Sequence, residues 1–409
     1  MKNLLKEYAQ LSVKVGANVQ KDQYVVVNSP VTCVELTRLI VEEAYLAGAK
    51  EVFVNFTDDV ISHHNYQYQS IETLCEIPEW LIAKFKDYVD KKVALIAISA
   101  PTPGLMKDID PMKMQKASIA SGQKMKFFSN YQMSEDCQWN IVAMPTFAWA
   151  TKVFPDLSEQ EAYDKLLEEI LKASRVSEEK SAVEAWEEHM DTLASHNKQM
   201  NDFNFESLHF ENSLGTNLTV KLVKDHIWAG GAEHTGSGVR FAPNIPTEEM
   251  FTMPDRLHVN GVVHSSKPLN YAGNLIKDFY LKFENGKVVD YGAKEAQESL
   301  KSLIEFDEGS CYLGEVALVP HDSPISNSGI LFLNTLFDEN ASCHLALGRC
   351  YPMNIKGGLQ MSEEELKAHG GNQSMTHVDF MFGTADMKVV GTTFDGKQIT
   401  VMENGNFVI

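Results

Sequence analysis

Residues 24–56, YVVVNSPVTCVELTRLIVEEAYLAGAKEVFVNF, contain the pattern that decides the fold class. The runs 24–28 and 52–56 are apolar and rich in β-branched residues, without the alternation of a half-exposed strand. Between them, apolar side chains recur at helical spacing, and Gly48 suits the end of the helix. The face that they form consists of Leu36, Leu39, Ile40, Ala44 and Ala47. The stretch therefore predicts a helix between two strands of a parallel sheet.

The same order of strands and helices continues toward the middle of the chain. We expect a helix around 79–89, a strand at 93–99, a further strand at 140–144 and a helix at 158–173. Non-alternating strands that are separated by helices indicate a mostly parallel sheet covered on both faces. We therefore predict a doubly wound α/β domain over residues 1–185.

From about residue 204 the pattern changes to short alternating runs that are punctuated by Asn-Gly and Gly-Gly pairs. Residues 283–288, FENGKV, read as a hairpin whose two-residue turn is Asn285-Gly286. The charged stretch 177–190 is either a connection or a helix at the boundary. We predict a second domain, β-rich and of the α+β class, over residues 186–409.

The bulk composition excludes several classes of protein. Of the 409 residues, 44% are hydrophobic and 22% are charged, which is typical of a folded chain. The formal net charge of −20 argues against nucleic acid or an anionic membrane as the main partner. No window approaches the roughly 20 apolar residues of a membrane span. Polar residues interrupt the N-terminal stretch and the six cysteines are scattered, so we expect a cytoplasmic protein with reduced thiols.

The first candidate functional residue is a carboxylate in the apolar run 311–320, CYLGEVALVP. Read as a strand, this run is apolar on both faces except at Glu315, which shares its face with Leu313 and Ala317. A carboxylate in such a strand is costly unless it is paired or binds a metal ion. A buried salt bridge and an edge position facing water are the alternatives.

The second candidate is a pair of residues in THVDFMFG at 376–383. Alternation places three apolar side chains on one face of the predicted strand, and His377 and Asp379 together on the other. An imidazole beside a carboxylate is a common combination of metal ligands. A His–Asp hydrogen bond without a metal is the alternative.

The third candidate segment is FDENASCHLALG at 337–348. It contains Glu339, and it embeds His344 among small and apolar residues; Tyr351 lies just beyond it. Each of the three residues has an ordinary alternative role. The acid suits a helix start, the histidine suits a hydrogen-bonded core position, and the tyrosine suits packing with its hydroxyl at the surface.

The fourth candidate segment is NIPTEEMFTMP at 244–254, in which two prolines bracket a short rigid loop. The loop contains the paired acids Glu248 and Glu249. Neighbouring side chains of an extended backbone point in different directions, so we expect one acid to lie inward and the other in solvent.

Together the four segments supply four carboxylates and two imidazoles in one half of the chain. A single zinc ion needs only about three or four ligands, whereas six oxygen and nitrogen ligands fit a two-metal site. No thiolate recurs in the set, which argues against a structural zinc site. The predicted ligands are Glu249, Glu315, Glu339, His344, His377 and Asp379.

These segments resemble the M29 family of metallo-aminopeptidases, also called the aminopeptidase T family. The resemblance covers nearly the whole chain and is most specific in NIPTEEMFTMP, CYLGEVALVP, LFDENASCHLALG and HVDF. It implies an α/β N-terminal domain, a β-rich C-terminal domain and a cytosolic homodimer. It also implies that the six predicted ligands hold two divalent ions, zinc, cobalt or manganese. Glu248 occupies a position that varies in the family, so we leave it out.

The reaction that the resemblance implies is hydrolysis of the first bond of a peptide with a free N-terminus, by a water molecule that the two metals activate. Glu315 is then the proton shuttle or a bridging carboxylate, and Tyr351 donates a hydrogen bond to the oxyanion.

Three other functions stay open from the residues alone. One is another two-metal hydrolase, such as an amidohydrolase acting on a small amide or a phosphodiesterase. Another is a metal-binding or peptide-binding protein without turnover. A nucleotide-dependent oxidoreductase is disfavoured, because no Gly-x-Gly-x-x-Gly follows an early strand.

Overall fold

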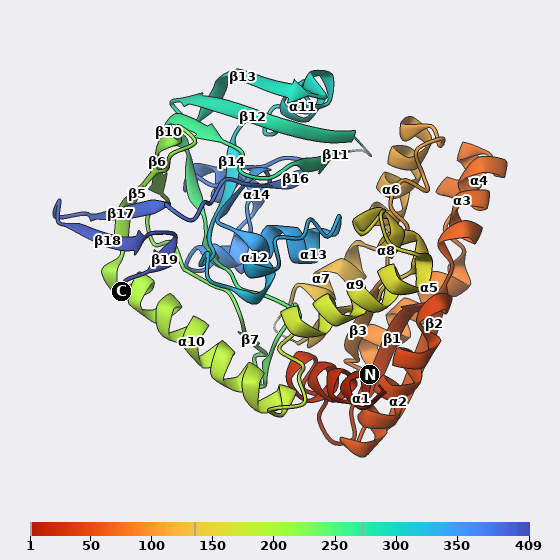
Figure 1. The fold of residues 1–409 in the computed structure, drawn as a ribbon. Coiled ribbons are helices and arrows are strands. Elements are labelled where there is room, and N and C mark those ends of the chain that lie inside the picture. Colours follow the sequence, from red (N-terminus) through yellow and green to blue (C-terminus); the bar gives the residue numbers. More distant parts are fainter. Residues whose placement is uncertain (1, 135, 272–273) are drawn as a thin grey trace. The chain divides into compact units, whose positions relative to one another are not determined.

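The computed structural model describes residues 2–134, 136–271 and 274–409, and Figure 1 labels the elements. The α-helices are α1 (Lys2–Leu11), α2 (Val34–Leu46), α3 (Asp59–Tyr68), α4 (Ile71–Cys75), α5 (Glu79–Asp90), α6 (Pro111–Lys124), α7 (Lys126–Gln132), α8 (Phe147–Val153), α9 (Glu159–Ala173), α10 (Ala182–Phe203), α11 (Gln297–Ile304), α12 (Pro324–Ser328), α13 (Thr335–Asp338) and α14 (Glu363–Ala368). The strands are β1 (Tyr24–Pro30), β2 (Glu51–Thr57), β3 (Ala94–Ser99), β4 (Trp139–Ala143), β5 (Phe205–Glu211), β6 (Asn217–Leu222), β7 (Glu233–His234), β8 (Arg240–Phe241), β9 (Met250–Thr252), β10 (Pro254–His264), β11 (Leu269–Tyr271), β12 (Asn274–Glu284), β13 (Lys287–Glu295), β14 (Leu313–Leu318), β15 (His344–Gly348), β16 (His377–Met381), β17 (Lys388–Thr393), β18 (Gln398–Glu403) and β19 (Asn406–Phe407). The described residues also form a π-helix, η1 (Ser12–Gly16). The 3-10 helices are η2 (Val31–Cys33), η3 (Glu339–Ala341), η4 (Pro352–Asn354) and η5 (Gly358–Gln360).

The chain forms two compact units, and one segment belongs to a different unit from its neighbours in sequence. The first unit consists of Met1–His189 and Ala232–Pro246, and the second of Met190–Gly231 and Thr247–Ile409. The border falls within α10, so part of the charged stretch that allowed two interpretations is helical. The proposed domain border between residues 185 and 186 stays a prediction.

The first unit is built on a parallel sheet. Its strand order is β2-β1-β3-β4, and every neighbouring pair is parallel. The three consecutive valines of β1 are all buried, as expected for a strand covered on both faces. At the end of α2, Gly48 has φ +99°, and the N–H of Ala49 donates to the carbonyl of Ala44 at 3.0 Å. The predicted doubly wound α/β architecture is confirmed.

The second unit contains two antiparallel sheets. The larger follows the order β11-β12-β10-β6-β5-β17-β18-β19, with β13 paired to β12, and the smaller is β16-β15-β14-β9. Their apolar side chains form one core, to which Phe210 and Leu281 of the larger sheet and Leu345 and Phe380 of the smaller contribute. The predicted β-rich α+β architecture is therefore confirmed.

The predicted hairpin lies between β12 and β13, where Glu284 pairs with Lys287. Its turn residues Asn285 and Gly286 have φ of +50° and +81°. A Cβ at Gly286 would lie 1.7 Å from the carbonyl oxygen of Arg256, so only glycine fits this position.

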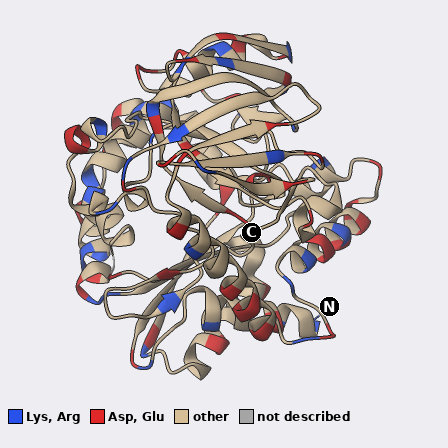
Figure 2. Ribbon diagram, turned by 90° about the vertical axis from the view of Figure 1, so that its left-hand side faces the viewer, with Lys and Arg blue, Asp and Glu red and all other residues tan. Residues whose placement is uncertain are grey.

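Basic and acidic residues are interspersed along the ribbon (Figure 2), and the 56 Asp and Glu residues outnumber the 36 Lys and Arg residues. Of the helices formed by the described residues, none has both the length and the apolar character that a membrane span requires.

Candidate metal centre

The pairing of the small sheet brings acids from different strands onto one face. Glu315 of β14 lies opposite Ala346 of β15, which in turn lies opposite Asp379 of β16. Residues directly opposite each other in a sheet point to the same side, so both carboxylates extend from that side. The alanine between them has a short side chain, which leaves space above it for ligands.

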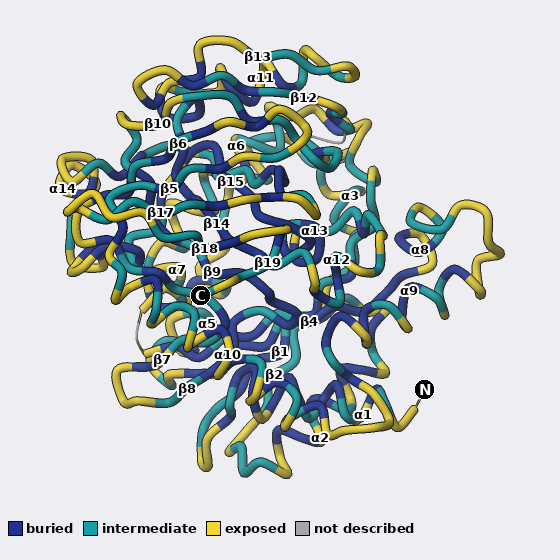
Figure 3. The backbone as a smooth tube through the Cα atoms, turned by 60° about the vertical axis from the view of Figure 1, so that its left-hand side comes forward, coloured by how far each residue is buried: buried dark blue, intermediate teal, exposed yellow. Residues whose placement is uncertain are grey.

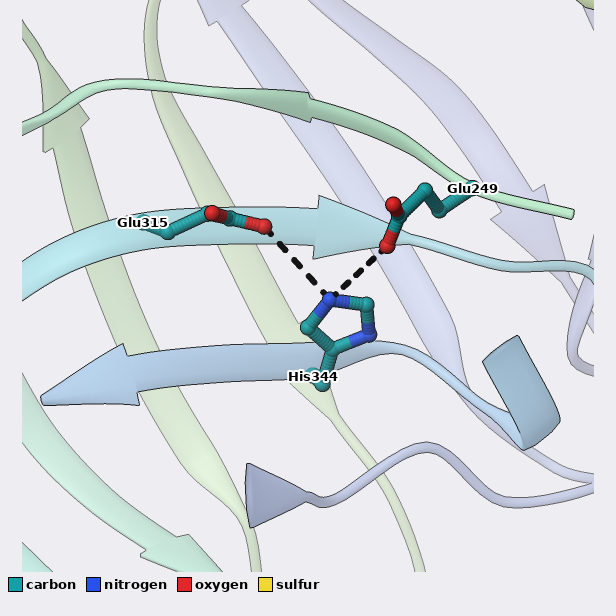
Figure 4. A group of neighbouring side chains, drawn as sticks. All are labelled: Glu249, Glu315 and His344. Carbon is teal, nitrogen blue, oxygen red and sulfur yellow. Dashed lines mark ion pairs between the residues drawn. The ribbon is translucent and has the colours of Figure 1, made fainter. Parts of the chain in front are cut away.

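Both histidines lie on the same face as these acids. His344 pairs with Ala317 of β14, and His377 pairs with Gly348 of β15, so each imidazole again stands beside a small residue. Glu249 directly precedes β9, and alternation places it on this face as well. Figure 4 shows the carboxylates of Glu249 and Glu315 directed at one nitrogen of His344.

A β-bulge at Gly314 decides which side chain of β14 faces the site. Leu313 pairs with Leu347 and Glu315 with Ala346, so two steps on β14 match one step on β15. The prediction that Leu313 and Glu315 share a face is therefore wrong, because the extra residue shifts the alternation. Leu313 packs in the core of the unit, while β14 and β15 are buried along their whole length (Figure 3).

Each histidine is held through one ring nitrogen by a backbone carbonyl. Nδ1 of His344 lies 3.2 Å from the oxygen of Ser342, and Nδ1 of His377 lies 2.7 Å from the oxygen of Arg349. A carbonyl only accepts, so Nδ1 carries the proton in both rings. This second contact is typical of metal-binding histidines, since it fixes the ring and leaves Nε2 as the ligand atom.

The two Nε2 atoms converge on carboxylates, and Glu315 is shared between them. His344 Nε2 lies 3.1 Å from Oε2 of Glu249 and 3.5 Å from Oε1 of Glu315. His377 Nε2 lies 3.4 Å from Oε2 of Glu315 and 3.3 Å from Oδ1 of Asp379. Two groups of candidate ligands result: Glu249, Glu315 and His344 form one, and Glu315, His377 and Asp379 form the other. In each group the residues offer one ligand atom apiece, and these atoms lie within 4.8 Å of one another.

The electrostatics of the cluster favour cations. Burial raises the pKa of Glu339 well above its ordinary value, and the charges of Glu249 and Asp379 raise it further. Burial opposes a charge on His377, yet the carboxylates of Asp379 and Glu315 beside it raise its pKa to about 11. The carboxylates of the cluster repel one another, and they therefore strongly stabilise a positive charge placed among them.

One atom of the cluster fits the role of a metal ligand with particular clarity. Oδ1 of Asp379 is buried and lies 3.3 Å from Nε2 of His377, but among the described residues it accepts no well-aligned hydrogen bond. Buried carboxylate oxygens are normally paired, because leaving one without a hydrogen bond costs free energy. A divalent cation would satisfy this oxygen, so the residues present fit a metal ion.

The remaining predicted site residues also lie in this region. Glu339 belongs to η3, and together with Asp379 it lines a pocket. The ring centroid of Tyr351 lies 4.7 Å from that of His377, and burial together with the charge of Glu315 raises the pKa of its hydroxyl. The structure therefore brings together the four carboxylates, the two imidazoles and the tyrosine that the sequence nominated.

The paired acids of the β9 loop differ from expectation. The prediction that one of them is solvated is wrong, because Glu248 and Glu249 are only 2% and 8% exposed. Asn340, fully buried beside Glu339, accepts a hydrogen bond at Oδ1 from the backbone N–H of Glu248 at 2.7 Å. This amide links the loop of one candidate ligand to the helix of another.

Asp307 holds the segment that leads into β16, and sequence reasoning missed it. Its Oδ1 accepts from the N–H groups of Gly309 and Ser310 at 2.9 and 2.8 Å, and its Oδ2 accepts from Met375 at 2.7 Å. The Asp-x-Gly-Ser spacing signals a local turn. Its contact with Met375, two residues before His377, has no signal in the sequence.

The pKa shifts predict how pH acts on the stability of the metal-free protein. Burial raises the pKa of Glu249 above 4.5 in the folded state, so its contribution to stability is present below 4.5 and is lost as pH rises through the folded value. The contribution of His377 is likewise present below 6.5 and is lost as pH rises toward about 11. Metal binding, in contrast, strengthens as protons leave the ligands.

We expect the difference in Tm between metal-loaded and metal-free protein to widen from about pH 5.5 to 8.5, measured by scanning calorimetry. A constant or shrinking difference would contradict the assignment of these residues as metal ligands.

Comparison with known proteins identifies the family. A family model described as thermophilic metalloprotease (M29) matches residues 1–407. The chain belongs to the M29 family. Aminopeptidase AmpS of Bacillus subtilis (strain 168) is 47% identical over 403 residues, which are 98% of each protein. Aminopeptidase T of Thermus aquaticus is 38% identical over 405 residues, which cover 99% of this chain and 98% of that protein. The predicted family is confirmed, and with it the class of metalloprotease.

Solved structures agree on the M29 fold. Wild-type AmpT from Thermus thermophilus matches with a TM-score of 0.92 at 36% identity, over 100% of both chains. A 2,5-dihydroxypyridine dioxygenase from Pseudomonas putida KT2440 matches with a TM-score of 0.52 at 10% identity, over 100% of this chain and 96% of that one. The second likeness concerns the fold alone, so the function of the M29 chain has to be argued from its site.

Proposed function

We propose that this chain is a two-metal aminopeptidase whose ligands are Glu249, Glu315, Glu339, His344, His377 and Asp379. The observation that carries the proposal is the position of Glu315, which belongs to both candidate groups of ligand atoms. One of its oxygens lies near His344 and the other near His377. A carboxylate placed in this way is suited to bridge two ions.

Charge balance supports two ions rather than one. The four ionised carboxylates carry four negative charges, and the imidazoles are neutral when their Nε2 atoms act as ligands. Two divalent cations bring four positive charges and neutralise the set, whereas a single cation leaves two buried negative charges unpaired. The oxygen and nitrogen donors suit zinc, cobalt or manganese.

The chemistry divides between the cations and the side chains. When bound, the two ions polarise a scissile carbonyl and lower the pKa of a water molecule. Glu315 would hold the ions or take up and return a proton, and its burial keeps this carboxylate away from bulk water. Tyr351, beside His377, retains its proton and can donate a hydrogen bond to an oxyanion.

The proposal that the first peptide bond is cleaved is supported by the names of the relatives. AmpS of Bacillus subtilis and aminopeptidase T of Thermus aquaticus are both named as aminopeptidases. On the resemblance stated above we also propose a cytoplasmic homodimer.

A substrate panel tests the proposal. Metal-loaded protein should release p-nitroaniline from leucine p-nitroanilide and not from its N-acetyl derivative, because acetylation removes the α-ammonium charge. It should leave bis(p-nitrophenyl) phosphate intact. Equal cleavage of the acetylated anilide would indicate another two-metal amidohydrolase, and cleavage of the phosphodiester alone would indicate a phosphodiesterase.

A further inference from the structure

The connection between β10 and β11 lies against the edge strand that carries two of the candidate ligands. The backbone N–H of Ser266 donates to the carbonyl of Met381 at 2.9 Å. Met381 follows Asp379 by two residues on β16, and both line the same pocket. Two residues of a strand span about 6.6 Å. Lys267, the next residue after Ser266, is therefore held close to the pocket, beside its lining residue Pro268.

The connection itself is well fixed. The N–H of Ser265 donates to the carbonyl of Phe279 at 2.8 Å, and its hydroxyl accepts from the N–H of Phe279 at 3.0 Å. After Lys267, Pro268 and Leu269 form part of the pocket wall, and Leu269 also packs in the core of the unit. The backbone of Lys267 is thus held on both sides.

The side chain of Lys267 has a charge without a partner. It is half-buried, and in the part of the chain that the structure describes its ammonium group makes no hydrogen bond or ion pair. Burial lowers its pKa, and the charge of Asp338 opposes that shift. Asp338 is itself occupied, since it accepts from the N–H groups of Phe332 and Asn334 at 2.7 and 3.0 Å. A half-buried ammonium without a partner is costly, and an anionic ligand would offset that cost.

The charge balance of the centre indicates which anion this is. Two divalent cations neutralise the four ligand carboxylates, and the remaining pocket acid, Asp338, is held by backbone N–H groups. Lys267, next to the pocket residue Pro268, therefore remains as an additional positive charge beside the pocket. The reacting carbonyl of a peptide is neutral before attack. In a short peptide the C-terminal carboxylate lies one or two residues beyond that carbonyl, which is about 4 to 7 Å and comparable to the offset of Lys267 along β16.

We propose that Lys267 binds the free α-carboxylate of a di- or tripeptide whose first peptide bond lies at the metal centre. The inference rests on the proposed aminopeptidase function and adds the class of substrate, short peptides with a free C-terminus. A charge-assisted hydrogen bond from Lys267 favours these substrates over the same peptides with a neutral end.

The experiment compares leucylglycine with leucylglycinamide, which differ only in the charge at the C-terminal end. Metal-loaded wild-type protein should show a kcat/KM about tenfold to a hundredfold higher for the acid than for the amide. Lys267→Met should bring this ratio close to one, mainly by raising KM for the acid, and Lys267→Arg should retain part of it. Lys277→Met serves as a control, because Lys277 pairs with Glu295 at 3.0 Å on the neighbouring strands β12 and β13.

Two outcomes overturn the inference. A wild-type ratio near one means that no carboxylate is recognised, and an equal loss on both substrates in Lys267→Met means that the lysine acts at the reacting carbonyl. Calorimetry with a reduced dipeptide, in which CH2–NH replaces the scissile amide, and with its C-terminal amide makes the same comparison without turnover. Absence of hydrolysis with preferential binding of the acid would therefore refute the proposed function alone.

Discussion

Replacing Glu315 by glutamine is expected to lower kcat/KM for aminoacyl anilides by about a thousandfold or more. The side chain is 6% exposed, and its two oxygens lie near different histidines. Glutamine has the same size but carries no charge, and its amide nitrogen cannot act as a ligand beside Nε2 of a histidine. Several kcal/mol of transition-state stabilisation depend on metal ions held in place, and their loss accounts for an effect of this size.

Metal analysis separates this role from a general loss of structure. The glutamine variant should bind fewer than two ions per chain while its far-ultraviolet circular dichroism stays that of the wild type. Glu308→Gln is the matched control, because the side chain of Glu308 is 87% exposed and pairs with Lys367 at 3.7 Å, away from the candidate ligands. Full activity in Glu315→Gln would refute both the bridging and the proton-shuttle role.

Removal of metal by a chelator should abolish hydrolysis and lower the Tm. Without cations, burial and the charges of Glu249, Asp379 and Glu315 raise the pKa of Glu339 well above its ordinary value, which shows that these carboxylates repel one another. A ligand present at a thousandfold excess over its Kd stabilises the folded state by about 4 kcal/mol, which gives the scale of the loss. Adding zinc, cobalt or manganese back should restore both quantities, with activity saturating at two equivalents. Undiminished activity in dialysed protein with no detectable metal would exclude the proposed mechanism.

Local patterns are sufficient for a large part of the fold. The absence of alternation in residues 24–28 predicted a strand buried on both faces, and β1 is such a strand. The turn at Asn285-Gly286 was predictable because only a few residue types adopt positive φ at both positions. His377 and Asp379 share a face because they lie two residues apart on one strand.

The candidate site was predictable only in its composition. Glu315 stands out because every neighbour in its run is apolar, and such a carboxylate needs a partner. His344 gave no comparable signal, since an isolated histidine among apolar residues is more often an ordinary core residue. The four carboxylates and two imidazoles of four separate segments suggested one set by their chemistry, and the likeness of these segments to the M29 family supported it.

The sequence by itself determined which residues could act and on which strands they lie, because strand alternation and turn chemistry are local. Only the tertiary structure decided that they meet. The bulge at Gly314 turns Glu315 away from the core, and the antiparallel pairing of β14, β15 and β16 aligns it with His344, His377 and Asp379. Contacts such as Asp307 with Met375 and Ser266 with Met381 depend on that pairing too. Registers between strands distant in sequence follow from packing of the whole core, and no local run of residues encodes them.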